Sequence, residues 1–320
     1  MRDGIALQKA RLLYRVAQAY YEQDLTQAEI ADRFGISRIK VSRMLTRARE
    51  EGIVRISVVA PPGDNTGLER DLEAAFGLAE AIVAEPGGAD YPDAVEAIGR
   101  AAAEYLSRVL EDGYTIGLTW GNTVLAAVTS LDYANLPNCR VVQLIGGLGS
   151  IEAEVHGADL VRRAAERLGC KARNIHAPGI VASESVRDAL VADQQVRDTL
   201  ELGKQSDLAL LGIGTLGPHS VLWEPGSVLS ADDCRMLQDL GVVGDIALRF
   251  FDVEGRPVAN PFTNRTIGLD LSDLMRIPRR VGIAGGTEKV PALRAALTAR
   301  LVNVLVTDSR TAATLLQQEE

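Results

Sequence analysis

The sequence predicts an α/β protein with two domains: a small all-helical head, followed by a larger domain built on a mostly parallel β-sheet. Two short helical patterns around a glycine turn, in residues 26–52, predict the head. From residue 68 onward, short apolar runs alternate with helical patterns, which is typical of a parallel sheet covered on both faces. Between these regions, residues 60–67 (APPGDNTG) have the composition of a linker. We therefore expect one domain at residues 1–60 and a second at residues 61–320, and a chain of 320 residues can bury two cores.

A supporting helix opens the predicted head. Apolar residues recur with a helical period between Leu7 and Tyr21. At the far end of the head, the alternating run IVRISVV at residues 53–59 predicts a short strand.

The segment between them carries the signals of a helix-turn-helix. Thr26 and Glu29 form a capping box, in which two side chains pair with the unbonded amides that open a helix. Gly35 suits the left-handed conformation that ends a helix. Ser37 can cap a second helix from Arg38 to about Glu51, and so short a turn makes the two helices cross steeply.

One side of the second helix is expected to be core and the other to face DNA. A turn of ~100° per residue groups Val41, Met44, Leu45 and Ala48 on one side. The opposite side carries arginines, hydroxyls and one aliphatic residue, which can read base edges in the major groove of double-stranded DNA. The alternative is a solvated helix in an ordinary helical hairpin. The candidate DNA-binding residues are Ser37, Arg38, Ile39, Lys40, Ser42, Arg43, Thr46 and Arg47.

Charge is divided unevenly along the chain. Residues 1–60 carry 11 lysines and arginines against 7 acidic residues, whereas the remainder carries 23 against 36. A basic head on an acidic body suits a protein that touches DNA with one end only, and it argues against broad, non-specific nucleic-acid binding. Since one helix-turn-helix reads only a half-site, we expect a homodimer or a homotetramer that binds operator DNA.

The cysteines and the start of the chain indicate a reducing compartment. Cys139, Cys170 and Cys234 lie far apart, without a CxxC pair or a histidine at metal spacing, so we expect neither a disulfide framework nor a metal site. The first residues lack a secretion signal, and no apolar run of about 18 residues exists to cross a membrane. We expect a cytoplasmic protein with no membrane partner.

The second domain is predicted to alternate strands and helices. Because ligands bind outside the carboxyl ends of parallel strands, the loops there are where we expect a site. The expected strands are residues 79–85, 114–120, 139–147, 207–214, 243–252, 279–286 and 303–308. The expected helices are residues 94–110, 122–131, 152–168, 231–240, 290–301 and 310–317.

Three of these loops carry candidate binding groups. Residues 115–128 read as a strand, a loop of glycines and hydroxyls, and a helix whose first amides can surround an anionic or polyhydroxylated group. Residues 207–226 run from a buried strand into a glycine loop with His219 and Glu224. Lys289 follows a glycine pair at a helix start, where an ammonium can meet a phosphate or carboxylate. A tight strand-helix turn and a solvated lysine remain the alternatives for the first and third loops.

In combination, these features resemble the SorC family of sugar-binding transcriptional regulators. The phrases GIG, GVVGDI (residues 241–246), FFDVEG (250–255), IAGGTEK and NVLVTD occur in the family's order, behind a leading helix-turn-helix. The resemblance covers nearly the whole chain. It implies a Rossmann-like effector domain, similar to glucosamine-6-phosphate deaminase and ribose-5-phosphate isomerase, which holds a sugar, a polyol or a sugar phosphate and needs no cofactor.

The same resemblance favours binding without turnover. His219 and Glu224 keep the spacing of the deaminases, but Gly217 stands where those enzymes have a catalytic aspartate. Without this carboxylate beside His219, proton transfer loses a partner, and we expect no catalytic residues. The alternative is a sugar-phosphate isomerase or deaminase with an appended DNA-binding head.

The resemblance also supplies the candidate effector site. Ile145 occupies a position where phosphate-binding members tend to have an arginine, which weakens the case for a bisphosphate and leaves room for a monophosphate or an unphosphorylated sugar. The candidate effector-binding residues are Gly117, Thr119, Trp120, Gly121, Asn122, Thr123, Gly146, Gly147, His156, Asp159, Gly214, Thr215, His219, Glu224, Asp245 and Lys289.

Overall fold

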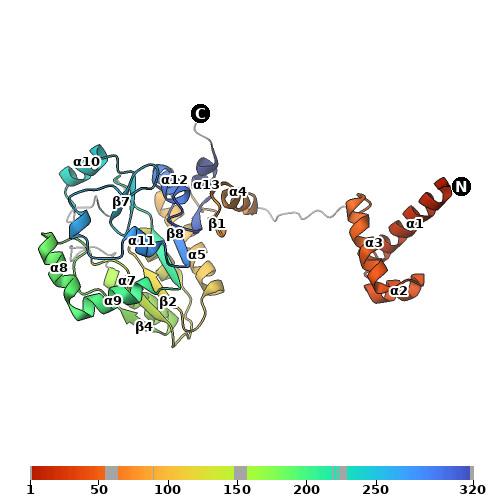
Figure 1. Cartoon of the computed structure of the whole chain (residues 1–320), viewed down its shortest axis with the longest axis horizontal. Coiled ribbons are helices and arrows are strands. Elements are labelled where there is room, and N and C mark those ends of the chain that lie inside the picture. Colours follow the sequence, from red (N-terminus) through yellow and green to blue (C-terminus); the bar gives the residue numbers. More distant parts are fainter. Residues whose placement is uncertain are drawn as a thin grey trace. The chain divides into compact units, whose positions relative to one another are not determined.

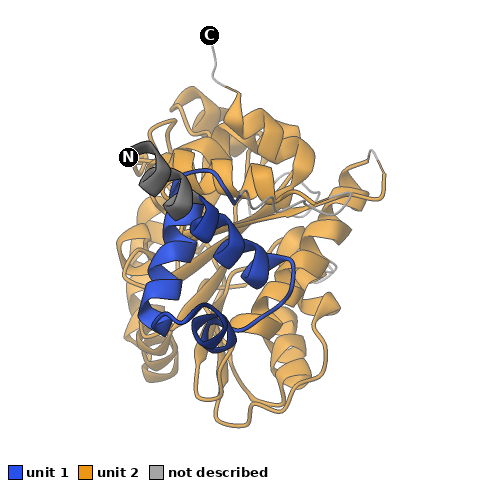
Figure 2. Ribbon diagram, turned by 90° about the vertical axis from the view of Figure 1, so that its right-hand side faces the viewer, with its two compact units in different colours: residues 1–62 blue, residues 63–320 orange. Residues whose placement is uncertain are grey.

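The computed structural model describes residues 2–54, 64–88, 90–147, 157–217, 220, 222 and 229–317, and side chains from residue 11 onward. The chain divides into two compact units, Met1–Pro62 and Gly63–Glu320, which are coloured blue and orange in Figure 2. Each unit has a hydrophobic core of its own.

Three helices make up the first unit: α1 (Arg2–Tyr21), α2 (Gln27–Phe34) and α3 (Arg38–Glu50). Their apolar faces meet in one cluster that includes Val16, Ile30, Val41 and Leu45. A strand was expected at residues 53–59, but residues 55–59 lie outside the described residues. Ile53 and Val54 are half-buried and pack against the base of α1 and α3.

The caps read from the sequence are confirmed. The Thr26 amide donates to Glu29 Oε2 at 2.8 Å, and the Glu29 amide donates to Thr26 Oγ1 at 3.3 Å. Gly35 has φ 63°, a left-handed conformation that favours glycine, and it ends α2. The Ser37 hydroxyl accepts a hydrogen bond from the Lys40 amide and so caps α3. The turn between the helices is therefore set by local chemistry.

A seven-stranded parallel sheet forms the centre of the second unit (Figure 1). The strand order is β1-β9-β8-β5-β2-β3-β4. The expected α/β fold with a mostly parallel sheet is thus confirmed. From β2 the chain moves outward to β3 and β4, whereas from β5 it moves the opposite way to β8 and β9, so the direction of winding reverses between β2 and β5. The strands are β1 (Glu80–Ala84), β2 (Thr115–Leu118), β3 (Arg140–Gln143), β4 (Lys171–Arg173), β5 (Leu208–Gly212), β8 (Arg279–Ile283) and β9 (Val304–Asp308).

Helices cover both faces of this sheet, because strands that are apolar throughout must be buried on both sides. In one layer α5 (Tyr91–Val109), α6 (Asn122–Ser130) and α7 (Gly157–Leu168) pack side by side. In the other, α13 (Ser309–Leu316) packs between α4 (Thr66–Phe76) and α12 (Val290–Thr298). The remaining helices are α8 (Glu184–Ala192), α9 (Gln194–Lys204), α10 (Ala231–Asp239), α11 (Leu271–Leu274), η1 (Thr263–Arg265) and η2 (Thr287–Lys289).

Two expectations from the sequence were wrong. The run at residues 243–252 is not a strand of the main sheet but a separate antiparallel hairpin of β6 (Gly244–Ile246) and β7 (Arg249–Phe251). Ala247 and Leu248 reverse the chain there with φ of 55° and 58°. The last residues of the expected linker at 60–67 are already helical, since α4 begins at Thr66, whose amide and hydroxyl donate to the Asp64 carboxylate.

Candidate functional site

The outer side of α3 is exposed, as the helical period predicted. All eight candidate DNA-binding residues are exposed in the first unit, and Ile39 is 68% exposed despite its apolar side chain. On the opposite side, Val41, Leu45 and Ala48 are buried and Met44 is half-buried. Single exposed aliphatic residues are common on protein surfaces, but one that stands among arginines on a helix of this kind can contact the methyl group of thymine. The DNA contacts of the eight side chains remain a prediction.

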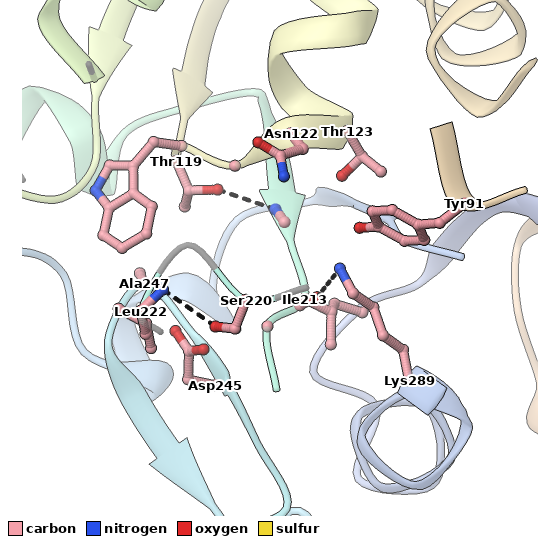
Figure 3. A pocket seen from close by; sticks show the side chains of 14 residues that line it. Tyr91, Thr119, Asn122, Thr123, Ile213, Ser220, Leu222, Asp245, Ala247 and Lys289 are labelled. Atoms are coloured by element: carbon pink, nitrogen blue, oxygen red, sulfur yellow. Dashed lines mark hydrogen bonds between the residues drawn. The ribbon is translucent and has the colours of Figure 1, made fainter. Parts of the chain in front are cut away.

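A cavity opens in the second unit where the winding of the sheet reverses (Figure 3). About 490 Å³ of space between protein atoms lies within it, and this figure includes space that is open to solvent. The loops after β2 and β5 form its floor, and the switch point of an open α/β sheet is the usual place for a ligand. It is lined by Tyr91, Thr119, Trp120, Gly121, Asn122, Thr123, Gly212, Ile213, Gly214, Ser220, Leu222, Asp245, Ala247 and Lys289.

Two threonines, Thr119 in the loop after β2 and Thr123 in the first turn of α6, fix the floor of the cavity. Thr119 Oγ1 accepts a hydrogen bond from the Gly212 amide at 2.9 Å, which ties this loop to the end of β5. Thr123 Oγ1 donates to the Ile283 carbonyl at 2.7 Å, which ties α6 to the end of β8. Both hydroxyls therefore have structural partners. Three strands are locked together around the pocket before any ligand arrives.

The start of α6 offers hydrogen-bond donors to the cavity. Gly121 precedes the helix with φ 140°, a value that L-residues rarely adopt, and no side chain of the described residues caps the helix. The first amides of a helix have no intrahelical acceptor and carry the positive end of its dipole. Since Gly121, Asn122 and Thr123 all line the cavity, this helix start is suited to hold an anion.

Lys289 brings a positive charge to the same cavity. Its side chain is only 7% exposed; Nζ donates to the Ile213 carbonyl at 3.4 Å and lies 5.7 Å from the centroid of the Tyr91 ring. In Figure 3 the Lys289 amino group points toward the Tyr91 ring, and Asn122 and Thr123 lie above them. A buried ammonium is costly unless a counter-charge or acceptors surround it, and among the described residues the Ile213 carbonyl, the Tyr91 ring and the charge of Asp245 act on this one.

Asp245 supplies a buried carboxylate on the other wall. Burial raises the pKa of Asp245 from its ordinary value to about 6, although a hydrogen bond from the Leu248 amide and the charge of Lys289 oppose this shift. Its backbone exchanges two hydrogen bonds with Gly214, at 2.9 and 3.1 Å, which fixes the β6–β7 hairpin against the end of β5. A carboxylate here can accept hydrogen bonds from ligand hydroxyls.

The cavity brings together half of the candidate effector-binding residues. Thr119, Trp120, Gly121, Asn122, Thr123, Gly214, Asp245 and Lys289 line it. Gly117, Gly146, Gly147, Asp159 and Thr215 do not belong to the lining. His156, His219 and Glu224 lie outside the described residues. The binding role of every candidate remains a prediction.

Packing explains two of the three candidate glycines that lie away from the cavity, Gly117 and Gly146, whereas a Cβ on Gly147 would meet no atom of the described residues within 4 Å. A Cβ on Gly117 would lie 2.7 Å from Leu144 Cδ1, and a Cβ on Gly146 would lie 2.5 Å from the Pro178 carbonyl oxygen. Asp159 is ion-paired with Arg162 and Arg163 on its own helix. The Trp120 indole donates to the Gly146 carbonyl at 3.3 Å, so the glycine pair supports a lining residue from behind.

Several lining residues were not selected from the sequence. Tyr91 is the first residue of α5 and belongs to no recognisable motif. Gly212 and Ile213 were visible in the GIG phrase, and Ser220 and Leu222 lie within the loop that carried His219. Ala247 comes from the turn of the hairpin, whose position against β5 is not a local property of the sequence.

Within residues 2–54, 64–88, 90–147, 157–217 and 229–317, no three histidine, cysteine, aspartate or glutamate side chains are grouped to hold a metal ion. In the same described part of the chain, every helix is too short or too polar to cross a membrane.

Comparison with known proteins agrees with this architecture. Residues 60–317 match the family described as a sugar-binding domain, and residues 9–59 match the Crp-like helix-turn-helix domain. The sequence is 32% identical over 309 residues to the deoxyribonucleoside regulator of Bacillus subtilis, covering 97% of this chain and 98% of the relative. It is 34% identical over 310 residues to the sorbitol operon regulator of Klebsiella pneumoniae, with coverage of 96% and 98%. The crystal structure of that full-length regulator, SorC, superposes with a TM-score of 0.74 at 33% identity, covering 96% of this chain and 99% of the other.

Proposed function

Since this chain belongs to the SorC family and is a sugar-controlled, DNA-binding transcriptional regulator, we propose that its effector is a sugar or polyol monophosphate. The ligand occupies the cavity at the switch point of the sheet. Binding there changes the affinity of α3 for operator DNA.

The buried Lys289 carries this proposal. Its ammonium and the uncapped start of α6 face the same cavity, and together they offer a positive charge and several donors to one anionic group. Asp245 and Ser220 lie on another side of the cavity, where they can bond to hydroxyls of the same ligand. A phosphate at one end of a polyhydroxylated chain matches both ends of the site.

The pocket binds its ligand without converting it. Gly217 has no side chain to act with a neighbouring base, and the relatives above are named as regulators. Regulation then rests on coupling between effector binding and operator binding. A ligand that prefers one arrangement of a two-fold symmetric dimer or tetramer shifts the spacing of its reading heads, and so its affinity for a palindromic operator. Such a regulator works in the cytoplasm, where its DNA is.

Matched ligand pairs test this proposal. The full-length protein is heated with sugars and polyols, each paired with its monophosphate, and the unfolding temperature is recorded, because a ligand that prefers the folded state raises it. We expect a phosphorylated member to raise the unfolding temperature more than its unphosphorylated partner. The same ligand should change the affinity for a promoter duplex in fluorescence anisotropy.

Two results would contradict the proposal. Equal stabilisation by a sugar and its monophosphate would remove the role of the anion site. Steady conversion of any ligand in the panel, detected by chromatography, would show that the protein is an enzyme and not a receptor without catalytic activity.

A further inference from the structure

Lys289 reaches the cavity from a loop whose shape is set elsewhere. Residues 284–286 connect β8 to η2, the helical turn that carries Lys289, and Gly286 lies at the bend with φ 103°. The Lys289 amide donates to the Gly286 carbonyl at 2.9 Å, so the position of Gly286 decides where the lysine starts.

Two side chains from a different part of the chain hold Gly286. Its amide donates to Thr311 Oγ1 at 2.8 Å and to Asp308 Oδ2 at 3.1 Å. The Thr311 hydroxyl donates in turn to Asp308 Oδ2 at 2.6 Å. Asp308 is the last residue of β9, and it is 2% exposed. Neither side chain lines the cavity.

The hydrogen bonds by which Asp308 and Thr311 hold the Gly286 amide are called the lock below, and the packing around them is tight. A Cβ on Gly285 would lie 2.3 Å from Asp308 Oδ2 and 2.3 Å from Ile98 Cδ1, so the loop backbone rests directly on the carboxylate. The other carboxylate oxygen, Oδ1, accepts from the amides of Arg310 and Thr311 and caps α13. Asp308 therefore serves two structures at once, with one oxygen for each.

We propose that Asp308 and Thr311 are positioning residues for effector binding, which hold Lys289 in the cavity by clamping the amide of Gly286. The inference rests on the proposed function, since it assigns Lys289 to the effector. Thr123 clamps the other end of the same loop through the Ile283 carbonyl. The lysine thus stands on a loop fixed by the starts of two helices, α6 and α13.

Asp308→Asn separates the lock from the cap. The amide oxygen can keep capping α13, whereas the new NH₂ group faces the N–H of Gly286, donor against donor. Thr311→Val removes the hydroxyl with little change of shape. Asp193→Asn is the matched control, because Asp193 caps α9 by accepting from the Gln195 amide and does not line the cavity.

Lysine labelling measures how well the lock keeps Lys289 buried, and it needs no effector. The chain has five lysines, at positions 9, 40, 171, 204 and 289. Full-length proteins are treated briefly with acetic anhydride, well below their unfolding temperatures, and each lysine is quantified by peptide mass spectrometry. Loss of a buried hydrogen bond should raise the labelling of Lys289 about ten-fold in Asp308→Asn and Thr311→Val. Lys171, Lys204 and the Asp193→Asn control should be unchanged.

Other results would overturn the inference. Unchanged labelling of Lys289 in both folded variants would show that the lock does not position it. An equal rise at Lys171 and Lys204 would show general loosening of the fold, which also contradicts the proposal.

A second arm uses the monophosphate found in the thermal screen. Asp308→Asn should weaken its binding about ten-fold while apo-operator affinity stays the same. If Lys289 becomes labelled but ligand affinity is kept, the positioning by Asp308 is supported, and it is the proposed contact of Lys289 with the effector that fails.

Discussion

Replacing Asp245 by asparagine should make the protein more stable at neutral pH and less responsive to its effector. Asparagine keeps the shape and an oxygen that can accept from the Leu248 amide, but it carries no charge. The buried carboxylate has its pKa raised by burial from 3.8 to about 6, so the folded protein holds this proton more tightly than the unfolded chain does. The stability that the neutral form contributes is complete below about pH 4 and is lost as the pH rises through about 6.

The size of the effect follows from that pKa. A shift from 3.8 to about 6 corresponds to roughly 3 kcal/mol in favour of the neutral form at high pH. Part of that difference is already present at about pH 4.5, so the free energy of unfolding of Asp245→Asn, minus that of the wild type, should grow by about 2 kcal/mol from there to about pH 7.5. Subtracting the two proteins cancels every other titrating group that they share.

Urea unfolding of both proteins across this pH range measures the difference directly. A difference that stays flat, or one that shrinks as the pH rises, would refute the assignment of a buried, proton-binding carboxylate. A stabilised variant that also loses its response to the effector would show that the charge is kept for binding at a cost in stability.

Three further substitutions test the rest of the picture. Lys289→Met should weaken the monophosphate at least about ten-fold in calorimetry and leave apo-operator binding intact, and equal affinity would remove Lys289 from the site. Arg43→Ala should cost roughly 1–3 kcal/mol on operator DNA in anisotropy, and unchanged affinity and base preference would exclude a base contact. Thr26→Ala should lower the stability of the first unit by about 1 kcal/mol, seen as faster amide hydrogen exchange in α2; unchanged exchange would mean that Glu29 alone secures the cap.

Much of the first unit could be predicted because its signals are local. A capping box, a left-handed glycine and a capping serine are each decided by neighbours within a few residues, and all three appear where the sequence placed them. The core side of α3 followed from periodicity, since Val41 and Leu45 are buried while Arg43 is exposed.

In the second unit, prediction succeeded where strands are apolar and long. It missed β4, which has only three residues, KAR, with both charged ones exposed at the sheet edge. It missed α8, in which no residue is buried, and α4, whose polar start resembled a linker. The β6–β7 hairpin was misplaced because sheet membership depends on distant partners.

The candidate site was predictable to the extent that it lies in strand-end loops. The turn after β2 and Lys289 carried glycine and charge signals of their own. Tyr91 and the Asp308–Thr311 lock did not, because they reach the site only through the packing of α5 and α13 onto the sheet. Tertiary proximity of this kind leaves no local trace.

The partner of β1 in the sheet bears on how the chain is made. Among the described strands β1 pairs with β9 alone, from Glu80 beside Val304 to Ala84 beside Asp308, so almost the whole second unit is synthesised between the two. Long-range pairing of this kind folds slowly, whereas three adjacent helices fold fast and need only residues that leave the ribosome first. During each round of synthesis, the reading head should therefore be folded before its sensor can be.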